Sequence, residues 1–260
     1  MANPVCLVLG AGAGIGGHVG ARFARDGYHA VLCRRSDEEG LKKLVAGIES
    51  EGGKASGRML NAAEDGAIET LIADVEKNIG AIEVVVFNLG AQIGNRALAD
   101  TNYKVFELCW RMACFGLYRV AHTVFPLMAE RGGGTLLVTS ATAAVRGNAG
   151  QHAHAAAMGG RRMLCQTLNA EYARQGIHVA HILVDGAVDA PDTLGKILGA
   201  EKFENLRATR GAADGLLQPP RMAETYFHLA QQHRSVWTHE LDLRSFSDLA
   251  WWNHDVDLDI

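Results

Sequence analysis

Short apolar runs alternate with longer amphipathic stretches along the whole chain. The runs predict strands that are buried on both faces, at Val5–Leu9, His29–Cys33, Arg58–Asn61, Glu83–Asn88, Thr135–Ser140, His178–Val184 and Val236–Arg244. Helices are predicted between them, at Ile15–Arg25, Leu41–Glu51, Glu64–Ile79, Tyr103–Glu130, His154–Arg174 and Ala223–Gln231. Because strand and helix alternate from end to end, the crossovers must cover both faces of one sheet. We therefore expect a doubly wound α/β fold of about seven mostly parallel strands.

A single domain is expected to hold all of these elements. The chain has 260 residues, a length at which α/β proteins often form one domain, and no linker interrupts the alternation. The regular pattern weakens over residues 188–220, where Gly195, Gly199 and Gly215 are compatible with a mobile lid over a substrate. Residues 245–260 are expected to form a C-terminal tail.

Composition narrows the possible partners. Hydrophobic residues make up 48% of the chain and charged residues 21%, as in ordinary globular proteins. A net charge of −4 with interspersed signs gives no footprint for nucleic acid or for an anionic membrane. No apolar run approaches the roughly 20 residues of a membrane span, and no signal peptide is recognisable. We expect a cytoplasmic protein that binds small molecules and further subunits.

Metal chemistry is not expected. None of the five cysteines belongs to a Cys-x-x-Cys pair, so buried free thiols are the simplest interpretation. His178 and His181 share a predicted strand but are three residues apart, which puts their side chains on opposite sides of the sheet. No His, Cys or carboxylate cluster has the spacing of a zinc site.

Glycines fill the loop between the first predicted strand and the first predicted helix. This loop permits a tight turn, and it lets backbone N–H groups approach a pyrophosphate at the positive end of a helix. A flexible loop that merely tolerates glycine is the alternative. The strand–loop–helix context favours a dinucleotide site, with contacts from Gly10, Gly12, Gly14, Ile15 and Gly16.

Two arginines follow the second predicted strand. In dinucleotide folds this position meets the adenosine ribose, where an acid suits a free 2′-hydroxyl and arginine suits a 2′-phosphate. Arg34, Arg35 and Ser36 stand there, and two guanidinium groups can clamp a phosphate. These residues favour NADP(H) over NAD(H). The alternative is a surface pair that bonds to Asp37 or Glu38.

The chain resembles the short-chain dehydrogenase/reductase superfamily over nearly its whole length. The spacing Gly10-x-x-x-Gly14-Ile15-Gly16 is that of the family, and Phe87-Asn88-Leu89-Gly90 falls where the family has Asn-Asn-Ala-Gly after the fourth strand. The resemblance implies a Rossmann-type fold and adds Asn88 and Gly90 to the cofactor site. It also places Asn61, with the adjoining Ala62, where the family usually has an adenine-binding Asp.

The proton-transfer residues of that family are all replaced in this chain. The family uses a Tyr-x-x-x-Lys pair, a Ser thirteen residues before the Tyr, and an Asn on the preceding long helix. The Tyr and Lys positions fall on His154 and Met158. The Ser position falls on Ala141, and the Asn position falls on Ala113.

His154 is a candidate substitute for the missing proton donor. A free imidazole titrates near neutrality without help from a lysine, so this side chain can supply the proton itself. Ser140 or Thr142, which flank the lost serine position, can orient a substrate oxygen if the strand end is slightly displaced. The alternative is that His152 and His154 cap or line the start of a helix without chemistry.

Three functions fit these observations. The first is an NADP(H)-dependent oxidoreductase that reduces a carbonyl or oxidises an alcohol, with His154 as an atypical donor. The second is a catalytically inactive dinucleotide-binding protein that acts as a sensor or subunit. The third, a non-redox lyase, is disfavoured because such relatives tend to lose the nucleotide loop.

The long predicted helices also indicate self-association. They resemble those through which family members pair, and Gly159-Gly160 costs about 1 kcal/mol per glycine in a helix unless close packing compensates. Arg161 and Arg162 are interpreted as exposed or interface residues and are left outside the site. We expect a homodimer or homotetramer, with Trp251 and Trp252 of the tail offering a further contact.

Overall fold

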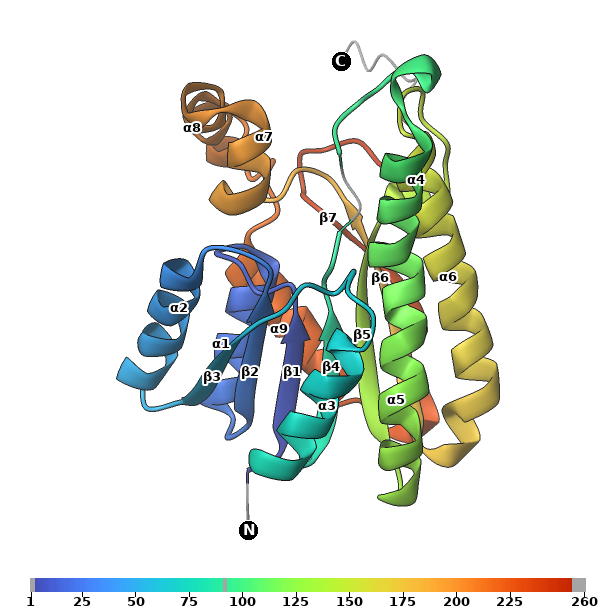
Figure 1. The fold of residues 1–260 in the computed structure, drawn as a ribbon. Coiled ribbons are helices and arrows are strands. Elements are labelled where there is room, and N and C mark those ends of the chain that lie inside the picture. Colours follow the sequence, from blue (N-terminus) through green and yellow to red (C-terminus); the bar gives the residue numbers. More distant parts are fainter. Residues whose placement is uncertain (1–2, 91–92, 254–260) are drawn as a thin grey trace.

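The computed structural model describes residues 3–90 and 93–253 and contains a seven-stranded sheet (Figure 1). Every neighbouring pair of strands is parallel. The expected doubly wound sheet is therefore confirmed. In spatial order its strands are β3 (Lys54–Met59), β2 (His29–Arg34), β1 (Val5–Leu9), β4 (Ile82–Phe87), β5 (Gly134–Ala141), β6 (Ile177–Asp185) and β7 (Glu240–Arg244).

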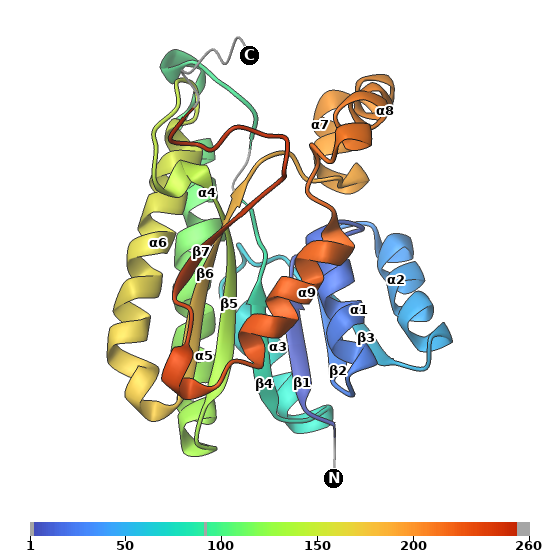
Figure 2. The ribbon, with the colours of Figure 1, turned by 180° about the vertical axis from the view of Figure 1, so that it is seen from behind.

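Helices cover both faces of the sheet, and each face has its own apolar core. One face carries α3 (Ala67–Asn78), α5 (Gly116–Glu130) and α6 (His152–Tyr172). The other face carries α1 (Ile15–Arg25), α2 (Glu38–Ser50) and α9 (Pro219–Ala230), as Figure 2 shows from behind. Strand residues supply alternate side chains to the two cores because successive side chains point to opposite faces.

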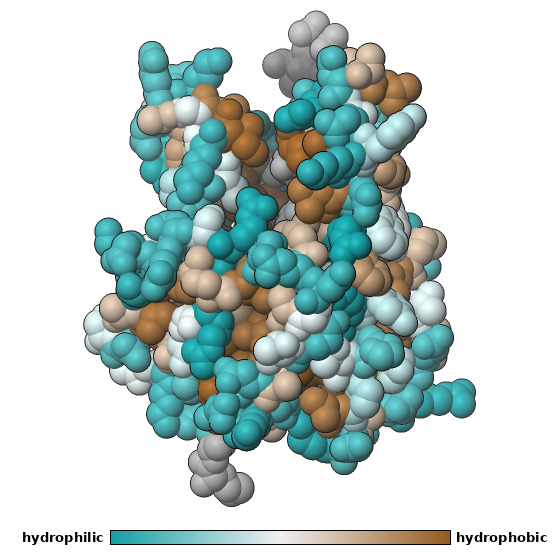
Figure 3. All heavy atoms as spheres, in the orientation of Figure 1, coloured by the Kyte–Doolittle hydropathy of each residue, from teal (hydrophilic) through white to brown (hydrophobic). Residues whose placement is uncertain are grey.

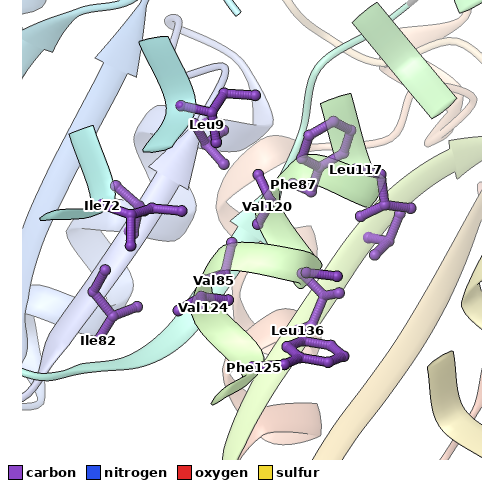
Figure 4. Packing of buried hydrophobic residues seen from close by; sticks show 14 of the residues in the cluster. Leu9, Ile72, Ile82, Val85, Phe87, Leu117, Val120, Val124, Phe125 and Leu136 are labelled. Atoms are coloured by element: carbon purple, nitrogen blue, oxygen red, sulfur yellow. The ribbon is translucent and has the colours of Figure 1, made fainter. Parts of the chain in front are cut away.

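Helix α5 shows how the sequence sets this packing. Its buried positions recur every three or four residues, so they form one apolar stripe. Figure 4 shows Leu117 and Val124 of that stripe beside Val85 and Phe87 of β4 and Leu136 of β5. The sheet–helix core therefore lies directly below the carboxyl ends of β4 and β5.

The stretch expected as one helix over Tyr103–Glu130 changes its winding at the centre. α4 (Tyr103–Trp110) passes into a π-helical turn over Arg111–Phe115, and α5 follows without a break. By length and composition this helix alone, among the described residues, is apolar enough to cross a membrane. More than half of its most apolar window is buried inside the fold, as in the core helix of a globular domain.

Three parts of the chain differ from the sequence-based expectation. β7 begins at Glu240 instead of Val236, because Arg234–Val236 forms a 3-10 turn. β3 spans Lys54–Met59 instead of Arg58–Asn61, because this edge strand is half exposed and carries no continuous apolar run. Residues 188–220 are mainly helical, with a π-helical turn over Pro191–Gly195 followed by α7 (Lys196–Leu198) and α8 (Ala200–Thr209). These helices rise beyond the carboxyl ends of the strands (Figure 1).

The expected C-terminal tail is described as far as residue 253, and residues 254–260 lie outside the described residues. Trp251 donates its backbone N–H to the carboxylate of Asp185 and accepts a bond from Arg146 through its carbonyl oxygen. The tail is thus fastened to the carboxyl end of β6. Its two tryptophans meet edge to face, with ring centroids 5.4 Å apart.

Candidate functional site

The turn between β1 and α1 excludes side chains. Gly10 has φ +97°, and a Cβ there would lie 2.7 Å from the carbonyl oxygen of Asn88. A Cβ at Gly16 would collide with the carbonyl oxygen of Gly10, and one at Gly14 would lie 2.9 Å from the Cβ of Ala190. Glycine is therefore required by close approach at these positions, which leaves the amino end of α1 open to an anion.

This turn forms one wall of a pocket of about 340 Å³. The other walls come from the segment after β4, from Thr139 of β5 and from residues 188–193. Of the proposed cofactor-binding residues, the pocket brings together Gly10, Gly12, Gly14, Ile15, Gly16, Asn88 and Gly90. Figure 3 shows the molecule hollowed at the carboxyl edge of the sheet, between α7 and α8 on one side and the upper end of α4 on the other, with apolar side chains inside the hollow.

Asn88 links the glycine turn to the centre of the sheet. Its Nδ2 donates to the carbonyl oxygen of Gly10 over 2.8 Å, and its backbone N–H donates to Leu9. These bonds fix the end of β4 against the end of β1. The shape of the pocket floor is consequently set by backbone contacts.

Arg34 binds two carboxylates. Its guanidinium lies 3.2 Å from Asp37 and donates to Oδ2 of Asp192 over 3.3 Å. The same oxygen of Asp192 accepts the backbone N–H of Ala13 over 3.1 Å. The alternative in which Arg34 bonds to Asp37 is thus observed, but together with a second acid from the lid that sequence reasoning missed.

Asp192 stands as an anion against the glycine turn. The N–H of Ala13 lowers its pKa most, and Lys196 and Arg34 lower it further. A backbone N–H and a guanidinium that hold one carboxylate oxygen are also suitable donors for a phosphate oxygen. No sequence signal reveals this contact, because Ala13 and Asp192 are far apart in the chain.

The remaining expected cofactor residues lie outside this pocket. Arg35 and Ser36 are exposed beyond β2. Asn61 bonds to Glu64 and to the N–H of Ala63 in a separate hollow after β3. Ala62 is buried, and its carbonyl oxygen accepts a bond from Arg119.

A second pocket of about 530 Å³ lies beyond the carboxyl ends of β5 and β6. Thr142 and His154 both line it, together with Gln151 of the preceding loop and Asp185 of β6. His154 is only 7% exposed. Ser140 is not among the lining residues. It is buried, and its Oγ lies 3.8 Å from the sulfur of Met158.

Small apolar side chains fill the space beside His154. Ala113 of the π-helical turn and Met158 of α6 are both buried there and belong to one cluster, completed by Cys109, Ala143, Ala153 and Ala157. Two positions where the family resemblance implies an Asn and a Lys are therefore occupied by an alanine and a methionine of the same apolar cluster. Neither side chain can carry or relay a proton.

Arg161 corrects the sequence interpretation, since it is 1% exposed and not a surface residue. Its Nε donates to the carbonyl oxygen of Ala113 over 2.9 Å, and its other nitrogens donate to those of Thr139 and Leu89. Burial lowers its pKa to about 10, so it stays charged at neutral pH. Sequence spacing could not show this, because the acceptors belong to three other elements.

Further side chains of α6 and β6 are also placed by the structure. Arg162 forms an ion pair with Glu240, which also bonds to the buried His181, and burial lowers the pKa of His181 to about 4. A Cβ at Gly160 would lie 3.1 Å from the sulfur of Cys114, whereas one at Gly159 would meet open space. The described residues contain no group of three metal-ligating side chains that could hold an ion.

Comparison with known proteins gives a consistent result. The family model described as short chain dehydrogenase matches residues 4–194. The chain is 29% identical over 240 residues to the short-chain reductase protein NovJ of Streptomyces niveus, covering 91% of this chain and 90% of that protein.

Two solved structures resemble this chain in both fold and sequence. A short-chain dehydrogenase from Rhodopseudomonas palustris is 30% identical with a TM-score of 0.77, over 93% of this chain and 98% of that one. A variant of actinorhodin polyketide ketoreductase, solved with NADPH, is 26% identical with a TM-score of 0.80, over 94% and 98%. Both chains match along almost their entire length.

Proposed function

Because the chain belongs to the short-chain dehydrogenase family, we propose that it is an oxidoreductase acting on a small carbonyl or alcohol substrate. The observation that carries this proposal is the glycine-walled pocket, which is lined by the glycines of the β1–α1 turn and by Asn88 and Gly90. A bound nicotinamide dinucleotide would supply or accept the hydride. The chain itself would hold that group at Gly10, Gly12, Gly14, Asn88 and Gly90 and would supply the proton.

The dinucleotide is proposed to be NADP(H). Arg34 and the N–H of Ala13 already hold an anionic oxygen, and exposed Arg35 and Ser36 adjoin them. A 2′-phosphate would replace the carboxylate of Asp192 on these donors. The similarity to a ketoreductase solved with NADPH supports the same choice.

His154 is proposed as the proton donor for carbonyl reduction. It shares a pocket with Thr142, whose hydroxyl can orient the substrate oxygen. Ser140 is not proposed to contact the substrate, because its hydroxyl lies against the sulfur of Met158. Protonated imidazole gives its proton to that oxygen as the carbonyl is reduced, which does not require the lysine of the family.

Residues 188–220 and the exposed sides of α4, α5 and α6 are proposed to contact the substrate and a second copy of the chain, respectively. Residues 188–220 would cover the substrate, because Asp192 and its neighbours already wall the glycine pocket. Exposed apolar side chains on α4, α5 and α6 would pair two copies of the chain, with contacts from Tyr103, Phe106, Trp110, Tyr118 and Met163. We expect a homodimer or homotetramer by light scattering at micromolar concentration, and a monomer would contradict this assignment.

The test of the proposed function has two stages. Fluorescence titration with NADPH and NADH measures binding, and loss of nicotinamide absorbance with a panel of aldehydes, ketones and quinones measures turnover. Binding followed by turnover supports the oxidoreductase. Binding without any turnover favours the sensor or subunit, for which the alanine and methionine beside His154 are the specific observation. Absence of binding overturns both.

A further inference from the structure

Arg161 places a positive charge in the interior without a negative partner. Of the ion pairs found among the described residues, none involves Arg161. The ionisable side chains whose charged forms would stabilise its charge are Cys165, Cys114 and Tyr226. Burial raises the pKa of each of these three groups, so all three are neutral at pH 7. The charge is stabilised by carbonyl dipoles and by the face of Phe87, whose ring centroid lies 5.0 Å away.

Two of the carbonyl groups that hold Arg161 belong to residues of the glycine pocket. Leu89 and Thr139 line that pocket, and both accept a hydrogen bond from the guanidinium through their backbone oxygens. The cation is therefore separated from the pocket by a single layer of backbone. Asp192 also faces the pocket, but Arg34 and Lys196 neutralise its charge.

We propose that Arg161 is a specificity-determining residue that makes the pocket bind a reduced nicotinamide dinucleotide in preference to its oxidised form. This inference rests on the proposed function. The oxidised nicotinamide ring carries a positive charge and the reduced ring is neutral, so the buried cation repels only the oxidised form. The complex that the chain forms most readily is then the one that receives a carbonyl substrate.

The expected size of the effect follows from electrostatics. Like charges separated by about 10 Å in a medium of effective dielectric constant near 20 change a binding equilibrium by roughly tenfold. Salt screens such a buried charge weakly. The preference should therefore persist at physiological ionic strength.

Calorimetric titration of the full chain with NADPH and with NADP⁺, repeated with NADH and NAD⁺, measures the preference directly. We expect the wild-type chain to bind the reduced form about tenfold more tightly. Arg161→Gln removes the charge and keeps hydrogen-bond donors, so the ratio should fall towards one, whereas Arg161→Lys should retain it. Arg162→Gln is the matched control, because Glu240 neutralises Arg162, and it should leave the ratio unchanged.

The outcomes separate this inference from the function on which it rests. Binding of neither form removes the proposed function. Equal or tighter binding of the oxidised form by the wild-type chain overturns the inference alone, and this measurement decides even if Arg161→Gln does not fold. Equal weakening of both forms in Arg161→Gln also overturns it, because that is the result of a purely structural role.

Discussion

The glycine pocket and the pocket of His154 lie at the same edge of the sheet but are built from different kinds of contact. The glycine pocket depends on backbone geometry, since Gly10 and Gly16 are excluded from carrying side chains by neighbouring carbonyl oxygens. The His154 pocket depends on which side chains project into it. Side-chain chemistry can be exchanged without moving the backbone, and this explains how one half matches its family while the other departs from it.

The comparison also concerns the positions at which the family resemblance implies proton-transfer residues. Ala113 and Met158 belong to one apolar cluster, and one turn further along α6 the buried Arg161 binds the Ala113 carbonyl. The positive charge of Arg161 thus lies behind the wall of the glycine pocket, where it binds the carbonyl oxygens of Thr139 and Leu89. If the glycine pocket and the His154 pocket are independent, a change in one should leave the function of the other intact.

The largest effect is expected at His154. His154→Gln should lower turnover by about two to four orders of magnitude, the usual range for removal of a general acid, while NADPH affinity stays nearly constant. Steady-state kinetics check both points, with His152→Gln as the control. Unimpaired turnover in His154→Gln would remove the proposed donor.

A side chain placed in the glycine turn should impair nucleotide binding by the glycine pocket. Gly16→Ala places a Cβ against the carbonyl oxygen of Gly10, and we expect nucleotide affinity to fall by about a hundredfold, equivalent to strain of about 3 kcal/mol. The control is Gly47→Ala, because a Cβ at Gly47 meets open space on α2. Titration calorimetry measures both affinities. Normal binding by Gly16→Ala would contradict the backbone account.

The choice between NADPH and NADH should depend on the arginines after β2. Changing Arg34 and Arg35 to Ala should weaken NADPH by about ten- to hundredfold, the cost of losing charge-assisted phosphate contacts, and should leave NADH almost unchanged. Arg25→Ala is a suitable control, because Arg25 pairs with Glu51 away from the pocket. Equal weakening of both nucleotides would remove the NADP(H) assignment.

The smallest effect is expected at Asp192. Asp192→Asn keeps the shape of the side chain but removes the charge that a phosphate must displace, so NADPH affinity should rise by up to about fivefold, the value of a partly exposed ion pair. Asp189→Asn serves as the control, since Asp189 pairs with Arg207 within the lid region. Weaker NADPH binding in Asp192→Asn would show that the carboxylate does not compete with the phosphate.

The sequence determined the buried parts of the fold well. The bounds of β1 and α1 agree with the expectation, because a continuous apolar run and a strong amphipathic period leave no other placement. β3 was displaced because an exposed edge strand needs few apolar residues. α8 was missed because it buries only Phe203 and therefore has almost no apolar stripe.

Within the candidate site, local patterns were informative and distant contacts were not. The glycine turn could be read from spacing alone, since its geometry is set within a few residues. The contacts of Asp192 with Ala13 and of Arg161 with Leu89 join residues far apart in the chain. Such contacts depend on how complete elements pack, which one-dimensional patterns do not contain.

The π-helical turn over Arg111–Phe115 has a consequence for the phase of the long helix. A π turn accommodates one residue more than an α turn, and one residue corresponds to a rotation of about 100° around the axis. Deleting a single residue there would turn the face of α4 that carries Phe106 and Trp110 away from its present direction relative to α5. The extra residue of the π turn thus sets both the position of the Ala113 carbonyl that Arg161 binds and the outward direction of Phe106 and Trp110.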